Sequence, residues 1–260
     1  MLQIKPTEHL TGITIQGDYN DFYELVESIY RMTGCDEDKT DLYYGVENRL
    51  LGLCYDIRHA YMGDSEILLE DNGMREDLMK WHGIVTPTKN VYYSVNILFP
   101  QAIFVAASVP TMYWYARRLY GKKRKNEDLD YELPPVPYVY YIRDKANLDV
   151  LCAAIWQALG EVIGDEELQK LMKTVQRLEE DEYIRYATHY IDKCDIELLK
   201  TPVDKRKDKL RNIAKRILKK PAAYEGMKSD LEYWAKEYNV SIYDLHDPDI
   251  DYPEPTEIDW

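Results

Sequence analysis

The sequence predicts an α+β fold, in which a mainly antiparallel sheet packed by helices is followed by a mostly helical C-terminal part. Two observations support this prediction. Alternating apolar and polar residues, the period of a strand, occur in the first half of the chain, most clearly at 90–99. After residue 147, apolar residues instead recur every three or four positions, the period of an amphipathic helix. The change of period predicts two parts with different architectures.

The first predicted elements are a β-hairpin and a helix. Residues 2–5 and 11–16 alternate in the pattern of two strands. Asp18 has the features of a helix N-cap, because Asp21 follows three residues later and an amphipathic stripe continues to Gly34. The polar run after this glycine is predicted to be a loop.

The stretch 41–63 is predicted to be the central helix of the N-terminal part. Spacings of three and four place its core-facing residues in one stripe: Leu42, Val46, Leu50, Leu53, Ile57 and Tyr61. A polar line beside this stripe contains Gly45, Arg49, Gly52, Asp56 and His59. Because a glycine inside a helix costs roughly 1 kcal/mol relative to alanine, we expect another element to pack closely against both glycines.

The remainder of the first half is predicted to contain a strand at 66–70, a turn, a short helix at 74–82 and the long strand at 90–99. A proline then breaks this strand. Residues 102–108 are predicted to form its partner strand, and Pro110 is predicted to begin a helix.

The charged, proline-containing stretch 122–137 is predicted to be a linker between two domains. An α+β domain at 1–121, built on the helix 41–63, precedes it, and a helical domain at 138–243 and an acidic tail at 244–260 follow it. The helical domain is expected to contain a strand at 138–142 and helices at 147–163, 166–178, 181–199, 203–219 and 222–238. The tail is expected to be disordered or to lie along the body.

Composition argues against several classes of protein. The chain has 260 residues and a formal net charge of −14, which opposes non-specific attraction to nucleic acid and to anionic membranes. No apolar run reaches about 18 residues, so no membrane span is predicted. The N-terminus lacks the basic and apolar regions of a signal peptide, and we therefore expect a cytoplasmic protein.

The sequence predicts neither a metal site nor a cofactor. The four cysteines lie far apart without a CxxC motif and are expected to be buried free thiols. The five histidines lack the spacings of metal ligands on one helix. Gly-rich phosphate loops and the GxSxG elbow are absent, which argues against nucleotide hydrolysis, dinucleotide chemistry and serine hydrolysis.

The candidate catalytic residues are Arg49, Asp56 and His59 on the central helix. Helical spacing allows them to share one surface, since Arg49 and Asp56 are two turns apart and Asp56 and His59 are three residues apart. They can form a satisfied buried network that fixes helix packing. Alternatively, they can line a pocket in which Asp56 orients His59 as an acid or base and Arg49 holds an anion.

A basic helix at 203–220 is the candidate binding surface. Its proposed binding residues are Lys205, Arg206, Lys209, Arg211, Lys215 and Arg216. This helix can grip a phosphate backbone or an acidic partner. Alternatively, the acidic tail neutralises it, because the tail carries seven acidic residues: Asp244, Asp247, Asp249, Asp251, Glu254, Glu257 and Asp259.

One further pair invites comparison with a known enzyme class. Arg185 and His189 are four residues apart in a predicted helix, and helical ribonucleases of the HEPN type also carry an Arg and a His close together on a helix. The spacing departs by one position from the usual pattern of those enzymes. A surface salt network beside the acidic run at 179–182 explains the pair more simply.

Three phrases resemble an uncharacterised bacterial family. They are ENRLLGLCYDIRH at 47–59, followed by MKWHGIVTP and KNVYYSVNILFP. The family is a domain of unknown function, and the resemblance covers roughly residues 1–120. It implies no activity and therefore assigns no catalytic residue.

These observations favour a non-catalytic cytoplasmic binding or regulatory protein that acts through protein–protein contacts, with a protein partner or through self-association. The 24 tyrosines against 3 phenylalanines fit this expectation, because tyrosine suits partly hydrated interfaces. The first alternative is a nuclease-like or phosphodiester-directed enzyme that uses Arg49, Asp56 and His59. The second is nucleic-acid binding through the basic helix 203–220.

Overall fold

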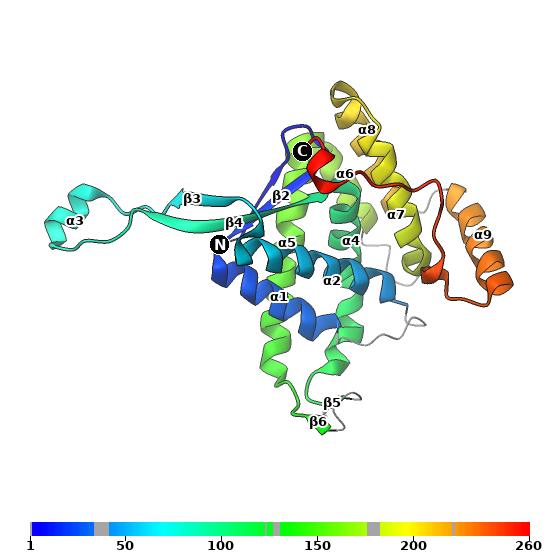
Figure 1. The fold of residues 1–260 in the computed structure, drawn as a ribbon, viewed down its shortest axis with the longest axis horizontal. Helices are drawn as coiled ribbons and strands as arrows, with labels where there is room; N and C mark the ends of the chain where they lie inside the picture. The colour runs from blue at the N-terminus through cyan, green and yellow to red at the C-terminus, as the bar shows by residue number, and fades with distance from the viewer. Residues whose placement is uncertain (1, 34–41, 123, 127–130, 176–182, 220–221) are drawn as a thin grey trace.

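The computed structural model describes residues 2–33, 42–122, 124–126, 131–175, 183–219 and 222–260. It confirms the predicted α+β class: a four-stranded antiparallel sheet near the N-terminus is packed by helices, and the C-terminal part is mostly helical. Figure 1 shows the two helices that follow the hairpin lying across the long helices of the core. The predicted loop at 35–41 lies outside the described residues.

The sheet has the order β1-β2-β4-β3. Strands β1 (Gln3–Pro6) and β2 (Gly12–Gly17) form the predicted hairpin. Strand β4 (Lys89–Leu98) pairs with β2 on one side and with β3 (Ile67–Asp71) on the other. Period-two alternation turns one set of side chains into the core, and its buried members include Ile13, Ile15, Val95 and Ile97.

Helix α1 (Tyr19–Thr33) begins as the sequence predicts. The Asp21 backbone N–H donates to Asp18 Oδ1 at 2.9 Å, and the Asp18 backbone N–H donates to Asp21 Oδ2 at 3.2 Å. This reciprocal cap satisfies two backbone donors at the start of the helix.

Helix α2 (Tyr44–His59) is the predicted central helix, and the turn η1 (Ala60–Asp64) extends it. The predicted stripe faces the core, with Leu42 and Tyr61 half-buried at its two ends and the four residues between them buried. The expectation of close packing at both glycines holds at Gly45 but is wrong at Gly52. A Cβ on Gly45 would lie 3.3 Å from the Thr188 side chain, whereas one on Gly52 would have no atom within 4 Å.

The predicted strand at 102–108 is wrong. These residues lie within helix α4 (Phe99–Ala116), which also contains Pro110, so this proline does not begin a helix. The segment is apolar on nearly every side and buried, and a short buried helix cannot be distinguished from a buried strand by periodicity. Pro100 lies in the first turn of α4, where its missing N–H is tolerated.

The predicted strand at 138–142 is also wrong, because these residues form the first turns of helix α5 (Tyr138–Ile163), which follows Pro137. By length and composition α5 could cross a membrane, but more than half of its most apolar stretch is buried in the protein. It packs against α1, α4 and β1, and the buried residues of both predicted domains form one hydrophobic cluster.

The stretch predicted to be a linker lies partly outside the described residues. Its described part includes the short strands β5 (Arg124–Asn126) and β6 (Tyr131–Leu133), which pair with each other. The helices that follow confirm four predictions closely: α6 (Asp165–Val175), α7 (Tyr183–Leu199), α8 (Val203–Lys219) and α9 (Ala222–Tyr238).

The C-terminal segment lies along the body, which was one of the two expectations for the tail. It starts with the 3₁₀ turn Ile242–Asp244 and ends beside the N-terminal hairpin (Figure 1). There the Thr11 hydroxyl donates to the Asp259 carbonyl at 2.9 Å, and the ring of Trp260 lies against Gly12.

A β-arm projects from the body. It consists of β3, helix α3 (Glu76–His82) and the first residues of β4, and Figure 1 shows it extending away from every other element. All of residues 61–91 are described, and none of them is buried.

Three of the four cysteines lie in the described part, and they confirm the expectation of buried free thiols. They are Cys54, Cys152 and Cys194. Burial raises the pKa of the Cys152 and Cys194 thiols to about 12, so both thiols are protonated at neutral pH.

Candidate functional site

Arg49 does not point toward Asp56 or His59 but toward α7. Its Nε donates to the Thr188 hydroxyl at 2.8 Å, and its Nη2 donates to the Thr188 carbonyl and to Asp192 Oδ1, each at 2.7 Å. The Arg49 side chain is 12% exposed. The structure therefore uses Arg49 to join α2 to α7.

The other two candidate catalytic residues lie further along α2, toward solvent. His59 Nδ1 lies 2.8 Å from Asp64 Oδ2, and the His59 ring packs on Tyr55. Partial desolvation raises the pKa of Asp56, and the neighbouring His59 opposes this shift. Asp56 and His59 are thus neighbours, as their spacing predicts, but Arg49 belongs to a different cluster.

Most of the candidate binding residues on α8 are paired within the chain. Lys209 and Arg216 both bind Glu197, the first at 2.9 Å, and Lys215 binds Glu167 at 3.1 Å. Arg211 binds Asp208 of its own helix at 3.1 Å. Lys205 is exposed and has no such partner among the described residues. The helices α6 and α7 therefore neutralise much of this basic surface.

Arg206 is the one residue of this set that pairs with the acidic tail. It is buried, and its guanidinium donates to the carbonyls of Thr201 at 2.9 Å and His9 at 2.8 Å. Its Nη1 lies 3.6 Å from the Asp259 carboxylate. In the described ion pairs of α8, neutralisation by the tail is thus limited to Asp259.

The cluster around Arg49 extends to the C-terminal segment through two carboxylates. The Tyr252 hydroxyl oxygen lies 2.8 Å from Asp192 Oδ1 and 2.8 Å from Asp195 Oδ2. Asp195 is fully buried, and its Oδ2 also accepts a hydrogen bond from Gln101 Nε2 at 3.0 Å. Its other oxygen, Oδ1, has no partner among the described residues.

This arrangement contains too few protons if both carboxylates are ionised. A phenol has one proton, so the Tyr252 hydroxyl can donate to only one of the two carboxylates. A proton on Asp195 completes the set, because its carboxyl group can then donate to the phenol oxygen. Burial raises the pKa of Asp195 to about 7, although Arg49 and the hydrogen bonds from Gln101 and Tyr252 lower it.

A pocket of about 320 Å³ borders this cluster. Helices α2 and α7 and the C-terminal segment form its walls, and the lining includes Gly45, Arg49, His189, Asp192, Tyr243 and Tyr252. Burial lowers the pKa of His189, and the buried Nε2 of this ring has no partner among the described residues. A second pocket, of about 460 Å³, adjoins the first at His189 and at 245–247.

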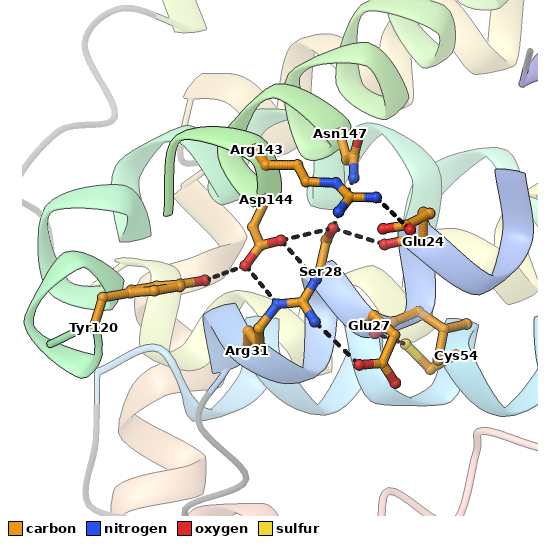
Figure 2. A network of polar contacts seen from close by, with 10 residues as sticks. Glu24, Glu27, Ser28, Arg31, Cys54, Tyr120, Arg143, Asp144 and Asn147 are labelled. Carbon is orange, nitrogen blue, oxygen red and sulfur yellow. Dashed lines mark hydrogen bonds and ion pairs between the residues drawn. The ribbon is translucent and has the colours of Figure 1, made fainter. Parts of the chain in front are cut away.

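A second polar network, which the sequence analysis missed, joins α1 to α5 (Figure 2). Asp144 is fully buried, and four donor atoms lie within hydrogen-bond distance of its carboxylate. Arg31 donates to it twice, from Nε and Nη2 at 2.8 Å each, and the Tyr120 hydroxyl donates at 2.8 Å. The Ser28 hydroxyl lies 3.1 Å from Asp144 Oδ1 and 2.7 Å from the Glu24 carbonyl, and these two acceptors share its single proton. Asn147 donates to the Ser28 hydroxyl at 2.8 Å and so extends the network.

A signal for this network exists in the sequence. Asp144 lies four residues before Leu148 and seven before Leu151, on the apolar stripe of α5. An aspartate on a core-facing stripe predicts a buried partner. Its partner on α1 could not be chosen from sequence, because that choice depends on how α1 and α5 pack.

The arm presents a second candidate surface of another kind. Trp81 is 83% exposed and Val85 is 100% exposed. Further exposed apolar residues of the arm are Ile67, Leu69, Leu78, Ile84 and Val91. Leu69 lies opposite Val91 in the sheet register, and Ile67 shares their face, so these three form one apolar strip on the ribbon.

Comparison with known proteins places the whole chain in one family without adding an activity. No curated protein and no solved structure matches the sequence significantly. A family model matches residues 2–260, more than twice the span over which the resemblance was expected. The chain therefore belongs to the family described as a domain of unknown function, DUF6904.

Proposed function

We propose that the protein is a non-catalytic cytoplasmic binding or regulatory protein that acts through protein–protein contacts, and that the β-arm is its contact surface. One observation supports this most strongly. Residues 61–91 include no buried side chain, yet eight large apolar residues of this stretch are exposed. Exposed apolar surface of this extent on a projecting element is typical of a site that a partner covers.

The arm lacks the contacts that would stabilise it alone. Helix α3 has seven residues and buries none of them. Isolated helices of this length and isolated two-stranded ribbons are at best marginally stable in water. A partner that packs on Trp81 and Val85 would supply the missing apolar burial.

Strand β4 connects the arm to the body. Its first three residues are exposed in the arm, whereas most of its later residues are buried in the sheet, where β4 pairs with β2. The arm therefore continues a strand that is held in the core. This attachment holds the tip of the arm at a distance from the body, where a partner can surround it.

The charge of the arm suggests the character of the partner surface. Between Asp64 and Asn90 the sequence has six acidic residues and three basic ones. A complementary surface would combine an apolar cleft for Trp81 with a basic rim. Such a surface can belong to another protein or to a second copy of this chain.

The geometry gives less support to the two alternatives. The nuclease reading needs Arg49 with Asp56 and His59, but Arg49 is committed to α7 through Thr188 and Asp192. The nucleic-acid reading needs free cations on α8, and most of the candidate residues there already pair with carboxylates of the chain.

A site-specific photo-cross-linking experiment tests the proposal. A photoreactive amino acid replaces Val85 at the tip in one variant and Trp114 on the body in another; Trp114 is 84% exposed and serves as a control of similar accessibility. After irradiation in the native cell, we expect a discrete cross-linked protein from position 85 and none from position 114. A product of twice the chain mass would identify self-association.

Two point variants then test whether the contact needs the apolar tip. We expect Trp81→Ser to reduce the yield of the position-85 product about tenfold or more, since a central tryptophan often dominates an interface. Trp114→Ser should leave that yield unchanged. Equal cross-linking from positions 85 and 114, or full yield with Trp81→Ser, would rule out the arm as the contact surface.

A further inference from the structure

The second pocket has an apolar wall with one acidic and two aromatic groups on it. It lies between α7, α9 and the C-terminal segment, and its volume of about 460 Å³ falls within the range of small-molecule sites. Helix α9 supplies one face of the pocket with the residues Met227, Asp230, Leu231, Trp234 and Tyr238. The spacings of three and four place these side chains on the same side of the helix.

The uncompensated charge in this pocket is negative. The Asp230 carboxylate has no hydrogen-bond or ion-pair partner among the described residues. Lys193 is the cationic residue of the opposite wall, and its Nζ binds Asp247 Oδ2 at 3.0 Å. Burial lowers the pKa of His189, so this wall residue is mainly neutral near pH 7.

The aromatic groups stand beside this carboxylate. The rings of Trp234 and Tyr238 stack with centroids 5.6 Å apart and an interplanar angle of 16°. Asp230 and Trp234 are four residues apart, so their Cβ atoms lie about 5–6 Å from each other on the helix surface. One cationic group can therefore contact the carboxylate and the indole face together, and tryptophan is the best aromatic partner for a cation.

We propose that this pocket binds a small organic cation in which an ammonium group is attached to an apolar or aromatic body. The ammonium group lies between the Asp230 carboxylate and the Trp234 ring, and the body packs against Met227, Leu231 and Leu245. This site is separate from the β-arm, and the proposal does not depend on the function assigned to the arm.

Calorimetric titration of the full chain with three probes of nearly equal size tests the proposal. The probes are 2-phenylethylamine, 2-phenylethanol and phenylacetate at pH 7, which carry a positive charge, no charge and a negative charge. We expect the amine to bind at least about tenfold more tightly than the alcohol, the difference made by one charge-assisted contact. Phenylacetate should bind most weakly.

Two charge-neutralising variants locate the contact. Asp230→Asn should weaken binding of the amine about tenfold or more and leave binding of the alcohol unchanged. Glu237→Gln removes a carboxylate from an exposed position of α9 outside the pocket lining, and it should bind the amine like the wild-type chain. Thermal melting of both variants checks that the fold is intact.

Four results would each overturn the proposal. Equal affinity for the amine and the alcohol would reduce the site to an apolar cavity. Tighter binding of phenylacetate would show an anion site, and unchanged amine binding in Asp230→Asn would place the contact elsewhere. Absence of binding heat for all three probes at millimolar concentration, with displacement of a fluorescent amine also absent, would likewise exclude a cation site.

Discussion

Asp144 and Asp195 are both fully buried aspartates, but their hydrogen-bond partners differ in kind. Asp144 receives two donors from a guanidinium fork and one from the Tyr120 hydroxyl, and it shares the proton of the Ser28 hydroxyl with the Glu24 carbonyl (Figure 2). Asp195 receives one amide donor and shares a single phenol proton with Asp192, while one of its oxygens has no partner among the described residues. The first carboxylate is fully satisfied as an anion, and the second is not.

This difference indicates that the two networks have different roles in the fold. The Asp144 network joins α1 to α5 and thereby connects the N-terminal elements to the long helix of the second half, with no pocket among the described ones at this position. The Asp195 network joins α2, α4 and α7 to the C-terminal segment and borders a pocket. A satisfied ion pair fixes helix packing, whereas a carboxylate that needs a proton makes its contacts depend on pH.

The largest effect is expected at Asp144. Asp144→Asn removes the negative charge and leaves the Arg31 guanidinium without its main buried partner. Loss of one partner of a buried ion pair costs about 3–5 kcal/mol, so we expect the free energy of unfolding to fall by about that amount. Urea denaturation at pH 7, followed by far-UV circular dichroism, measures the change.

Arg143→Gln is the matched control for this variant. It breaks the ion pair between Arg143 and Glu24 at the edge of the same network, where the side chains are 50% and 36% exposed. An exposed pair contributes about 0–1 kcal/mol, so the loss should be small. If both variants lost the same free energy of unfolding, the Asp144 network would contribute no more to stability than the exposed pair of Arg143 and Glu24.

A pH-dependent effect is expected at Asp195. Its pKa rises from 3.8 to about 7 on folding, so the folded protein binds an extra proton between these values. The contribution of Asp195 to stability is therefore fully present below about pH 4 and is lost as the pH rises through about 7. The free energy of unfolding of the wild type, minus that of Asp195→Asn, should fall by roughly 2–3 kcal/mol between pH 5 and pH 8.

The wild type and Asp195→Asn share all other titrating groups. Subtracting the free energy of unfolding of the variant from that of the wild type therefore removes the contributions of those groups. Asp251→Asn, at an exposed position of the same C-terminal segment, serves as the charge control and should give a nearly constant difference over this range. A constant difference for Asp195→Asn as well would mean that Asp195 stays ionised when folded. The Asp195 and Asp144 networks would then be alike in their proton requirements.

The helices and strands that carry these networks could be predicted from the sequence only in part. Periodicity identified β1, β2, β4, α1, α2 and most of the C-terminal helices, because each of them buries one face. It failed at 102–108 and 138–142. The first is buried on nearly every side within α4, and the second has the β-branched and aromatic composition of a strand although it forms the mostly exposed first turns of α5.

The candidate site could also be predicted only in part, because its contacts join helices that lie far apart in the sequence. The sequence identified Arg49 as a polar residue on the central helix, but its partners Thr188 and Asp192 are about 140 residues away along the chain. Likewise, Arg31 and Asp144 meet across 113 positions. Local spacing can place residues on one helix face, whereas the partner on another helix depends on packing that no local pattern records. This is why Arg49, Asp56 and His59 could share a face without forming one cluster.

The smallest effect is expected from alanine substitutions at the two glycines of α2, Gly45 and Gly52. Gly45 borders the Arg49 network, and Gly52 does not. Gly52→Ala should stabilise the protein by about 0.5–1 kcal/mol, because the new methyl group meets open space and alanine favours the helix. Gly45→Ala brings the same helix preference but places its methyl group 3.3 Å from Thr188 Cβ and 3.4 Å from the Tyr243 ring. We expect it to be less stable than Gly52→Ala by about 1 kcal/mol or more in urea denaturation.

Gly45→Ala should also loosen the network of Arg49 and Asp195 and leave the Asp144 network unchanged. The reason is that Thr188, which the new methyl group meets, holds Arg49, and Tyr243 belongs to the C-terminal segment. Amide hydrogen exchange at 241–252 should therefore accelerate in Gly45→Ala but not in Gly52→Ala. Exchange around Asp144 should be equal in the two variants. If the two glycine variants gave equal stability and equal exchange at 241–252, the contact between α2 and α7 at Gly45 would be loose enough to admit a methyl group, and the Arg49 network would not depend on close helix packing there.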